Sequence, residues 1–321
     1  MHGAKRNKND ILFKFPVTAE KNVRKNHFML QNKFSGMGVA LITPFKKNKK
    51  VDFEALERLI DYQLSSETDY IVVLGTTAET PTLEEKEREE IVRLVVKRVG
   101  GEIPIIMGVG GNNTAQLIHT LKTFDFTGVS AILSVTPYYN KPTQEGLFQH
   151  YRALSEVSPL PIILYNVPGR TGVNLLAETT LRIARECKNV IAIKEASGNM
   201  EQINRIIAGK PDGFSVISGD DAMTLPIIKA GGIGVISVLG NAFPKRFVQI
   251  VHLALDGNIK KAEEDVSVFS EVIRLLFVDG NPAGVKCMLH EMGFIENVLR
   301  LPLVPVCDET AACIRREISI L

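Results

Sequence analysis

The chain has 321 residues, of which 45% are hydrophobic and 23% charged, a globular composition with room for one large α/β barrel domain or two smaller domains. No apolar run approaches the roughly 20 residues needed to cross a bilayer, and the N-terminal stretch has no apolar segment followed by a small-residue cleavage site. We therefore expect a soluble, unexported protein with no membrane partner.

Cysteine and histidine spacing gives no sign of a metal site. The six histidines form no paired ligand motif, and the cysteines stand at no spacing typical of zinc ligands or of a CxxC motif. We expect no bound metal, and reduced thiols in a cytoplasmic protein. The cysteines are Cys187, Cys287, Cys307 and Cys313.

The formal net charge of +2 is unevenly distributed along the chain. Residues 1–35 hold eight Lys or Arg and two acidic residues, which leaves 30 basic and 34 acidic residues for the rest. A polybasic tail can bind nucleic acid or anionic lipid, but this one has few aromatic residues, no repeat and no amphipathic period. We expect residues 1–35 to be a disordered or dispensable tail, and we expect no nucleic-acid partner.

From residue 36 onward, short apolar runs with β-branched residues each precede a longer segment of helical period. This alternation is typical of βα units with a parallel sheet. Eight strands separated by single helices favour a closed barrel, and roughly 220 residues is close to the usual barrel length of about 250. The sequence therefore predicts an α/β fold, a (β/α)8 TIM barrel over residues 36–258. The runs lie at 38–45, 70–77, 104–111, 128–139, 161–170, 190–197, 214–221 and 234–243.

Helix starts support this interpretation. Asp52 is a candidate N-cap for the helix that follows it, and Thr82 precedes a run of acidic residues typical of a first helical turn. Residues 259–321 predict two or three further helices, one of them within "PAGVKCMLHEMG". We interpret these as a helical region appended to the barrel, because some 60 residues make a marginal core alone.

Catalytic groups in such barrels lie at the C-terminal ends of the strands and in the loops that follow. Those positions are unusually polar in this chain. They include Gly75, Thr76 and Thr77 in the second unit, Tyr138 and Tyr139 in the fourth, Tyr165 and Arg170 in the fifth, Lys194 in the sixth, and Gly219, Asp220 and Asp221 in the seventh.

Lys194 follows four apolar residues in "VIAIKEASGN", where the pattern predicts a buried strand. A buried ammonium group is costly unless it is paired or neutralised, and a neutral lysine is a nucleophile that condenses with carbonyl compounds. Lys194 is thus a candidate Schiff-base lysine. The alternative is that it forms an ion pair with Glu195 or with an aspartate of the seventh strand.

Three other side chains suit such chemistry, and each has a structural alternative. Tyr165 is a candidate proton carrier if Thr76 and a tyrosine of the fourth unit relay the proton, but it can equally be a core aromatic residue, and the threonines ordinary turn residues. Arg170 in "NVPGRTG" offers a planar fork for a carboxylate, or it is a surface arginine in a turn.

Glycine and aspartate motifs give weaker signals. Neither "GVGGNN" (108–113) nor "AGGIGV" (230–235) completes a dinucleotide or Walker pattern. Asp220 and Asp221 are possible Mg²⁺ ligands without obvious partners, so we favour capping of the next helix.

Six motifs taken together resemble the dihydrodipicolinate synthase family, over residue 36 to the C-terminus. They follow the order of the predicted strands, which makes their coincidence specific although each is short. They are "GTTAE", "TPYYNKP", "LYNVPGRTG", "IKEASGN", "SGDD" and "GVISV".

The resemblance implies that pyruvate forms a Schiff base with Lys194 and that its enamine adds to L-aspartate 4-semialdehyde, on the route to diaminopimelate and lysine. It also implies a homotetramer and no metal or organic cofactor. In the family's proton relay, Tyr165 and Thr76 are joined by Tyr139 from a neighbouring subunit. Among the pocket residues, the resemblance assigns the pyruvate carboxylate to Thr77, the semialdehyde carboxylate to Arg170, and the pocket lining to the backbones of Gly219 and Ile236.

Sibling enzymes remain as the alternative. N-acetylneuraminate lyase and 2-keto-3-deoxy sugar-acid aldolases share the lysine and the tyrosine, whereas the arginine in "NVPGRTG" is typical of the synthases. A catalytically silent binding barrel is the non-enzyme alternative, and it has no reason to retain all of these residues together.

Two departures from the family pattern concern Ala78 and the inhibitor site. Ala78 stands where glycine is common. Strongly inhibited members bind lysine with a histidine and a glutamate, and the matching residues here are Arg88 and Gln116. Exchanging a carboxylate for an amide and adding a cation disfavour an ammonium ligand, so we expect weak or absent feedback by lysine. The whole candidate set is Thr80, Arg88, Asn112, Gln116 and Tyr138.

Overall fold

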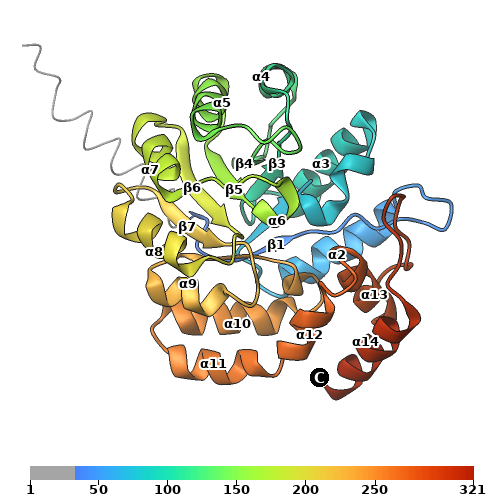
Figure 1. Cartoon of the computed structure of the whole chain (residues 1–321). Coiled ribbons are helices and arrows are strands. Elements are labelled where there is room, and N and C mark those ends of the chain that lie inside the picture. Colours follow the sequence, from blue (N-terminus) through green and yellow to red (C-terminus); the bar gives the residue numbers. More distant parts are fainter. Residues whose placement is uncertain (1–32) are drawn as a thin grey trace, which may run out of the picture.

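The computed structural model describes residues 33–321. Eight parallel strands form a closed barrel in which each strand pairs with the next and the last pairs with the first. Figure 1 shows the strands at the centre of the molecule with the helices around them. The predicted barrel is therefore confirmed. The strands are β1 (Gly36–Ala40), β2 (Tyr70–Val73), β3 (Ile105–Gly108), β4 (Ala131–Val135), β5 (Ile162–Asn166), β6 (Val190–Glu195), β7 (Ser215–Ser218) and β8 (Gly234–Ser237).

The helices of the barrel layer alternate with these strands. Three short 3₁₀ helices, η1 (Thr76–Ala78), η2 (Thr80–Thr82) and η3 (Leu239–Asn241), lie in loops that follow β2 and β8. The barrel helices are α2 (Phe53–Ser65), α3 (Glu85–Val99), α4 (Thr114–Thr123), α5 (Gln144–Val157), α6 (Pro168–Thr171), α7 (Ala177–Glu186), α8 (Met200–Gly209), α9 (Thr224–Ala230) and α10 (Pro244–Leu255).

Buried apolar side chains form two clusters, one between the strands and the helices and one inside the barrel. The inner cluster takes side chains from every strand, among them Ile163 and Tyr165 of β5 and Ala192 of β6. Side chains of a strand alternate between its two faces, so Lys194, two residues after Ala192, also faces the inside. The alternation of the strands thus places the lysine at the inner wall of the barrel.

One predicted helix start is confirmed and one is wrong. The Asp52 side chain accepts a hydrogen bond from the Ala55 amide at 3.2 Å and caps α2. Helix α3 begins at Glu85 rather than at Thr82, because Glu84 and Glu87 form a capping box. Thr82 instead ends η2 and donates its hydroxyl to the Glu79 carbonyl at 2.9 Å. A glutamate cap is a weaker sequence signal than a threonine, which explains the error.

The predicted tail covers residues 1–35. Residues 1–32 lie outside the described range, and residues 33–35 lie inside it. Phe34 is buried and packs edge-on against Tyr70 at the base of the barrel, with ring centroids 6.0 Å apart. The Ser35 hydroxyl donates to the Ile233 carbonyl at 3.0 Å. Contacts with the barrel therefore begin two residues before β1.

Residues 259–321 form four helices where two or three were predicted. They are α11 (Ile259–Ser267), α12 (Ser270–Leu275), α13 (Ala283–Glu291) and α14 (Asp308–Ile320). Only Val268 and Phe269 separate α11 from α12. The helical period therefore barely changes between the two helices, and the sequence pattern does not show where one ends and the next begins. In Figure 1 the last two helices lie to one side of the barrel near α2, where Tyr62 of α2 packs against Phe294 with ring centroids 4.7 Å apart.

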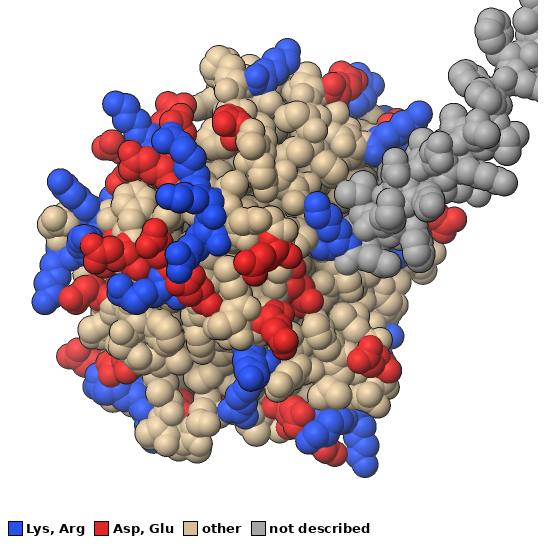
Figure 2. Space-filling model, turned by 180° about the vertical axis from the view of Figure 1, so that it is seen from behind, with Lys and Arg blue, Asp and Glu red and all other residues tan. Residues whose placement is uncertain are grey.

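Within residues 33–321 no helix combines the length and the apolar character that a membrane crossing demands. Figure 2 shows basic and acidic side chains interspersed on the back of the molecule.

Candidate active site

Lys194 and Tyr165 lie side by side on adjacent strands. They are register partners in the pairing of β5 with β6, and each is 6% exposed. The Lys194 Nζ lies 4.3 Å from the centroid of the Tyr165 ring. Because both residues stand near the C-terminal ends of their strands, the amine and the phenol share one end of the barrel interior.

Lys194 has no ion-pair partner among the described residues, and this rejects the structural alternative for it. Glu195 points to the other face of β6, where its carboxylate accepts hydrogen bonds from the Asn166 and Gln202 side chains and from the Ser197 amide, at 2.9 to 3.2 Å. Burial raises the pKa of Glu195 above its usual range. Through the bond to Asn166, Glu195 links β6 to β5 on the outer face of the barrel. The Lys194 amine forms no ion pair with it.

Asp220 and Asp221 form no ion pair with Lys194. Neither side chain caps the next helix, so the capping prediction is wrong. Helix α9 begins beyond them with Met223 at its N-cap position and no side-chain cap. The buried Asp221 carboxylate accepts from the amides of Val238 and Leu239, at 3.1 and 2.9 Å, and burial raises its pKa to about 6. It therefore stabilises the start of η3 after β8, a contact between distant residues that local spacing does not predict.

Gly219 borders Lys194, and Ile236 lies in the inner cluster of the barrel. A Cβ on Gly219 would lie 2.9 Å from the Lys194 Cε and 2.8 Å from the Ala196 Cβ, so only glycine leaves room for the lysine side chain. Ile236 is 1% exposed and belongs to the same inner cluster as Tyr165. Gly219 therefore shapes the wall beside the Lys194 side chain.

The loop after β2 carries Thr76 and Thr77. Thr76 is half-buried and Thr77 is 2% exposed. A hydrogen bond from the Thr80 hydroxyl to the Gly75 carbonyl, 2.9 Å long, spans this loop. Ala78 lies in η1 without a positive φ, so the loop accommodates its side chain without backbone strain.

Arg170 stands in α6, a single helical turn directly after β5, and its side chain is exposed. Its Nη2 donates to the Asn281 carbonyl at 3.4 Å. Asn281 also donates from its side-chain Nδ2 to the Thr77 Oγ1 at 3.0 Å. One residue of the C-terminal region thus contacts two candidate substrate-binding residues, which the sequence did not indicate.

No side-chain hydrogen bond links the relay candidates Tyr165, Thr76 and Tyr139 within the described part of one chain. The Tyr139 side chain is 84% exposed and its backbone has a φ of 73°, and among residues 33–321 it makes no hydrogen bond to Thr76 or Tyr165. The loop of Tyr139 is held to α6 by its amide, which donates to the Thr171 carbonyl at 3.4 Å. A large aromatic side chain held out in solvent by a strained backbone is an unusual arrangement for a residue without a partner.

Four of the five candidate lysine-site residues form two local pairs. The Arg88 Nη2 donates to the Thr80 carbonyl at 3.0 Å, and the Asn112 Nδ2 donates to the Tyr138 carbonyl at 3.5 Å. Gln116 is exposed on α4. The arginine head group therefore faces the loop that carries the catalytic candidates.

A buried ion pair attaches the C-terminal region to that same loop. Lys286 of α13 and Glu79, both fully buried, form an ion pair, and the Lys286 Nζ also donates to the Val298 carbonyl at 3.0 Å. Burial lowers the pKa of Lys286 to about 8 although the Glu79 carboxylate opposes this shift. The Arg300 amide donates to the second Glu79 oxygen at 3.0 Å. The loop of Thr76 and Thr77 is thereby fixed from outside the barrel.

We expect Lys286→Met to lower the free energy of unfolding by about 3–5 kcal/mol, because it leaves the Glu79 carboxylate buried without its partner. Urea denaturation followed by circular dichroism measures the change. The double variant Glu79→Gln/Lys286→Met removes both charges and should recover much of the loss. A single variant as stable as the parent would show that the pair does not hold the loop.

The glycine-rich motifs have structural explanations. A side chain on Gly108 would collide with the Leu74 carbonyl, and one on Gly234, whose φ is +144°, with the Gly36 carbonyl. These glycines let neighbouring strands approach closely. Among the described residues no group of three or more His, Cys, Asp or Glu side chains is placed to hold a metal ion.

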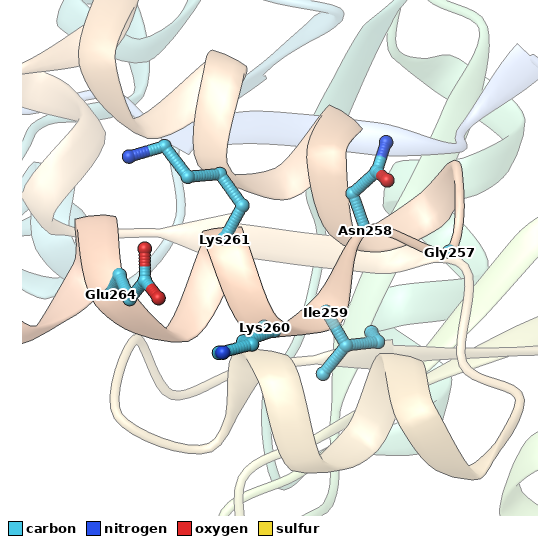
Figure 3. Close-up of a pocket in the computed structure, with 6 residues that line it drawn as sticks. All are labelled: Gly257, Asn258, Ile259, Lys260, Lys261 and Glu264. Carbon is cyan, nitrogen blue, oxygen red and sulfur yellow. The ribbon is translucent and has the colours of Figure 1, made fainter.

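Two surface hollows lie away from these candidates. The first is at the start of α11, where Figure 3 shows its side chains pointing in different directions. The second lies between residues 46–53 and the start of α3, beside Arg300. Neither contains a predicted catalytic or substrate-binding residue. The residues around the first are Gly257, Asn258, Ile259, Lys260, Lys261 and Glu264.

A buried lysine beside a tyrosine at the C-terminal end of a (β/α)8 barrel is an arrangement suited to Schiff-base chemistry. The model of the dihydrodipicolinate synthetase family matches residues 33–321. The chain belongs to this family. Its membership confirms the resemblance that the six motifs indicated.

Relatives of known name support the same family. A 4-hydroxy-tetrahydrodipicolinate synthase of Parabacteroides distasonis is 61% identical over 288 residues, which cover 89% of this chain and 97% of the relative. One of Phocaeicola vulgatus is 60% identical over 277 residues, 86% of this chain and 93% of the relative. The crystal structure of the dihydrodipicolinate synthase from Thermotoga maritima superposes with a TM-score of 0.87 at 46% identity and covers 90% of this chain and 98% of that one.

These relatives confirm the predicted activity, that of a 4-hydroxy-tetrahydrodipicolinate synthase, a lyase of lysine and diaminopimelate biosynthesis. Asn281, Glu79 and Lys286 contact or support the candidate site but were not predicted from the sequence. Lys286 carried a usable signal, since it interrupts the apolar pattern of "PAGVKCML" much as Lys194 interrupts "VIAIKEA".

Proposed function

We propose that this chain condenses pyruvate with L-aspartate 4-semialdehyde through a Schiff base on Lys194. The observation that carries the proposal is the buried amine of Lys194, which has no ion-pair partner among the described residues and lies over the Tyr165 ring. The amine attacks the keto carbon of pyruvate, and the carbonyl oxygen leaves as water. The resulting iminium withdraws electrons from the methyl carbon, which loses a proton and attacks the aldehyde carbon as an enamine.

Tyr165 is proposed to carry protons in these steps, with Thr76 and Tyr139 completing the relay. Because Tyr139 is exposed in its own chain, the proposal places it in the site of a neighbouring copy within a homotetramer. The proposed compartment is the cytoplasm, in line with four free cysteine thiols. A monomer would then have an incomplete relay.

The proposed substrates are tested by following pyruvate consumption with L-aspartate 4-semialdehyde and, in parallel, with N-acetylmannosamine. Turnover with the semialdehyde alone is the expected result. Turnover with the amino sugar alone would retain the Schiff base and reject the substrate, and it would favour the sibling lyase. Absence of turnover with both would favour a binding barrel.

Arg170→Ala should lower kcat/KM for the semialdehyde by roughly 10- to 100-fold while pyruvate trapping stays intact, because a hydrogen bond to a charged group is lost from only one substrate. Arg170→Lys keeps the charge but not the fork, so it should recover part of the loss. Steady-state kinetics with each substrate varied measures the effect. An unchanged kcat/KM for the semialdehyde would contradict the role of Arg170.

We also propose that lysine inhibits this enzyme weakly or not at all. The Arg88 guanidinium, held on the Thr80 carbonyl, repels the ammonium group of a lysine ligand, and Gln116 offers no charge to attract it. Titration of the activity with lysine measures inhibition. An inhibition constant in the low micromolar range would show the proposal to be wrong.

A further inference from the structure

Asn281 lies in the loop between α12 and α13, outside the barrel, yet it is 7% exposed and contacts the candidate site. Its Nδ2 donates to the Thr77 Oγ1 at 3.0 Å, and its carbonyl accepts from the Arg170 Nη2 at 3.4 Å. Its Oδ1 is buried and has no hydrogen-bond partner within residues 33–321. A residue kept only for packing has no need of such a buried polar group, which costs free energy.

The direction of the bond to Thr77 has a chemical consequence. A threonine hydroxyl has one proton to donate and lone pairs to accept. Because the Thr77 oxygen accepts from the Asn281 amide, its own proton is not used in that bond and remains available for another acceptor. The resemblance assigns the pyruvate carboxylate to Thr77, and a carboxylate is an acceptor.

We propose that Asn281 is a positioning residue that directs the Thr77 hydroxyl proton toward the pyruvate carboxylate. This inference rests on the proposed function. It adds a residue of the C-terminal region to the determinants of pyruvate affinity. The buried Lys286–Glu79 pair holds the same two segments together, since Glu79 lies two residues after Thr77 and Lys286 lies five after Asn281.

Two substitutions at Asn281 separate this role from a structural one. In Asn281→Asp both side-chain oxygens are acceptors, so the Thr77 hydroxyl donates to the aspartate and not to pyruvate. The aspartate also adds a negative charge near the pyruvate carboxylate. The half-saturating pyruvate concentration should therefore rise roughly tenfold or more. In Asn281→Ala the hydroxyl is free to turn to pyruvate, so the rise should be only a few-fold. A structural residue gives the opposite order, because aspartate preserves the shape and alanine does not.

The readout is the pyruvate concentration that half-saturates borohydride trapping on the full chain, measured by intact mass, with KM and kcat for pyruvate beside it. The increase should lie in KM rather than in kcat. Asn297→Asp is the matched control, because Asn297 also has a buried Oδ1 without a hydrogen-bond partner on the C-terminal segment and should leave pyruvate affinity unchanged.

A Thr77→Val background completes the test. With no hydroxyl to redirect, Asn281→Asp should raise the half-saturating concentration by a clearly smaller factor than it does in the parent. An equal factor in both backgrounds, or a larger effect of alanine than of aspartate, would overturn the inference. If pyruvate and borohydride leave the parent chain itself unlabelled, the proposed function fails, and the inference fails with it.

Discussion

Lys194→Met is expected to lower kcat by at least about 10³-fold and to abolish borohydride-dependent labelling by pyruvate, because it removes the amine that forms the proposed covalent intermediate. The fold should survive. Lys194 has no ion-pair partner among the described residues, so its removal leaves no counter-charge buried alone, and methionine fills a similar volume.

The matched control for this prediction is Lys286→Met, the other buried lysine. It removes an ion pair instead of a nucleophile, so it should lower the free energy of unfolding and retain pyruvate labelling under conditions where the chain is folded. Intact mass after trapping and urea denaturation of both variants give the two readouts. Labelling of the Lys194→Met chain at another lysine, with turnover retained, would reject Lys194 as the nucleophile.

Tyr165→Phe should reduce kcat by about 10²- to 10⁴-fold, the range typical of lost general acid–base catalysis. Its stability should change little, because the Tyr165 hydroxyl makes no hydrogen bond to any other described residue, while the ring that packs beside Lys194 is kept. Pyruvate labelling should still reach completion, but more slowly. Single-turnover trapping and steady-state kinetics distinguish the slow step from lost binding.

Tyr151→Phe is the control for the phenol. Tyr151 of α5 is fully buried, and its hydroxyl donates to the Ser134 carbonyl at 3.1 Å. This variant should lose about 0.5–1.5 kcal/mol of stability, the usual net value of such a bond, and keep its kcat. A similar fall of kcat in both variants would assign the Tyr165 effect to packing and not to proton transfer.

The sequence alone was enough to predict the barrel and to propose Lys194 and Tyr165 as its reactive residues. The βα alternation is a local pattern, because each strand and helix shows its period within about 10 to 15 residues. The inner-face placement of Lys194 and Tyr165 could be predicted for the same reason, because the side chains of a strand alternate between its two faces. The six motifs added the family and, through it, the expected substrates.

The interrupted apolar pattern by itself does not separate Lys194 from Lys286, whereas the tertiary structure does. Each lysine interrupts an apolar run, so the same local signal marks both. Glu79, which neutralises Lys286, lies 207 positions earlier in the chain, whereas the glutamate next to Lys194 in sequence points to the other face of its strand. The bonds from Asn281 to Thr77 and Arg170 likewise join segments 204 and 111 positions apart. Local sequence patterns determine which residues form strands and helices, but the pairing of charged and polar groups depends on which distant segments the closed barrel brings together.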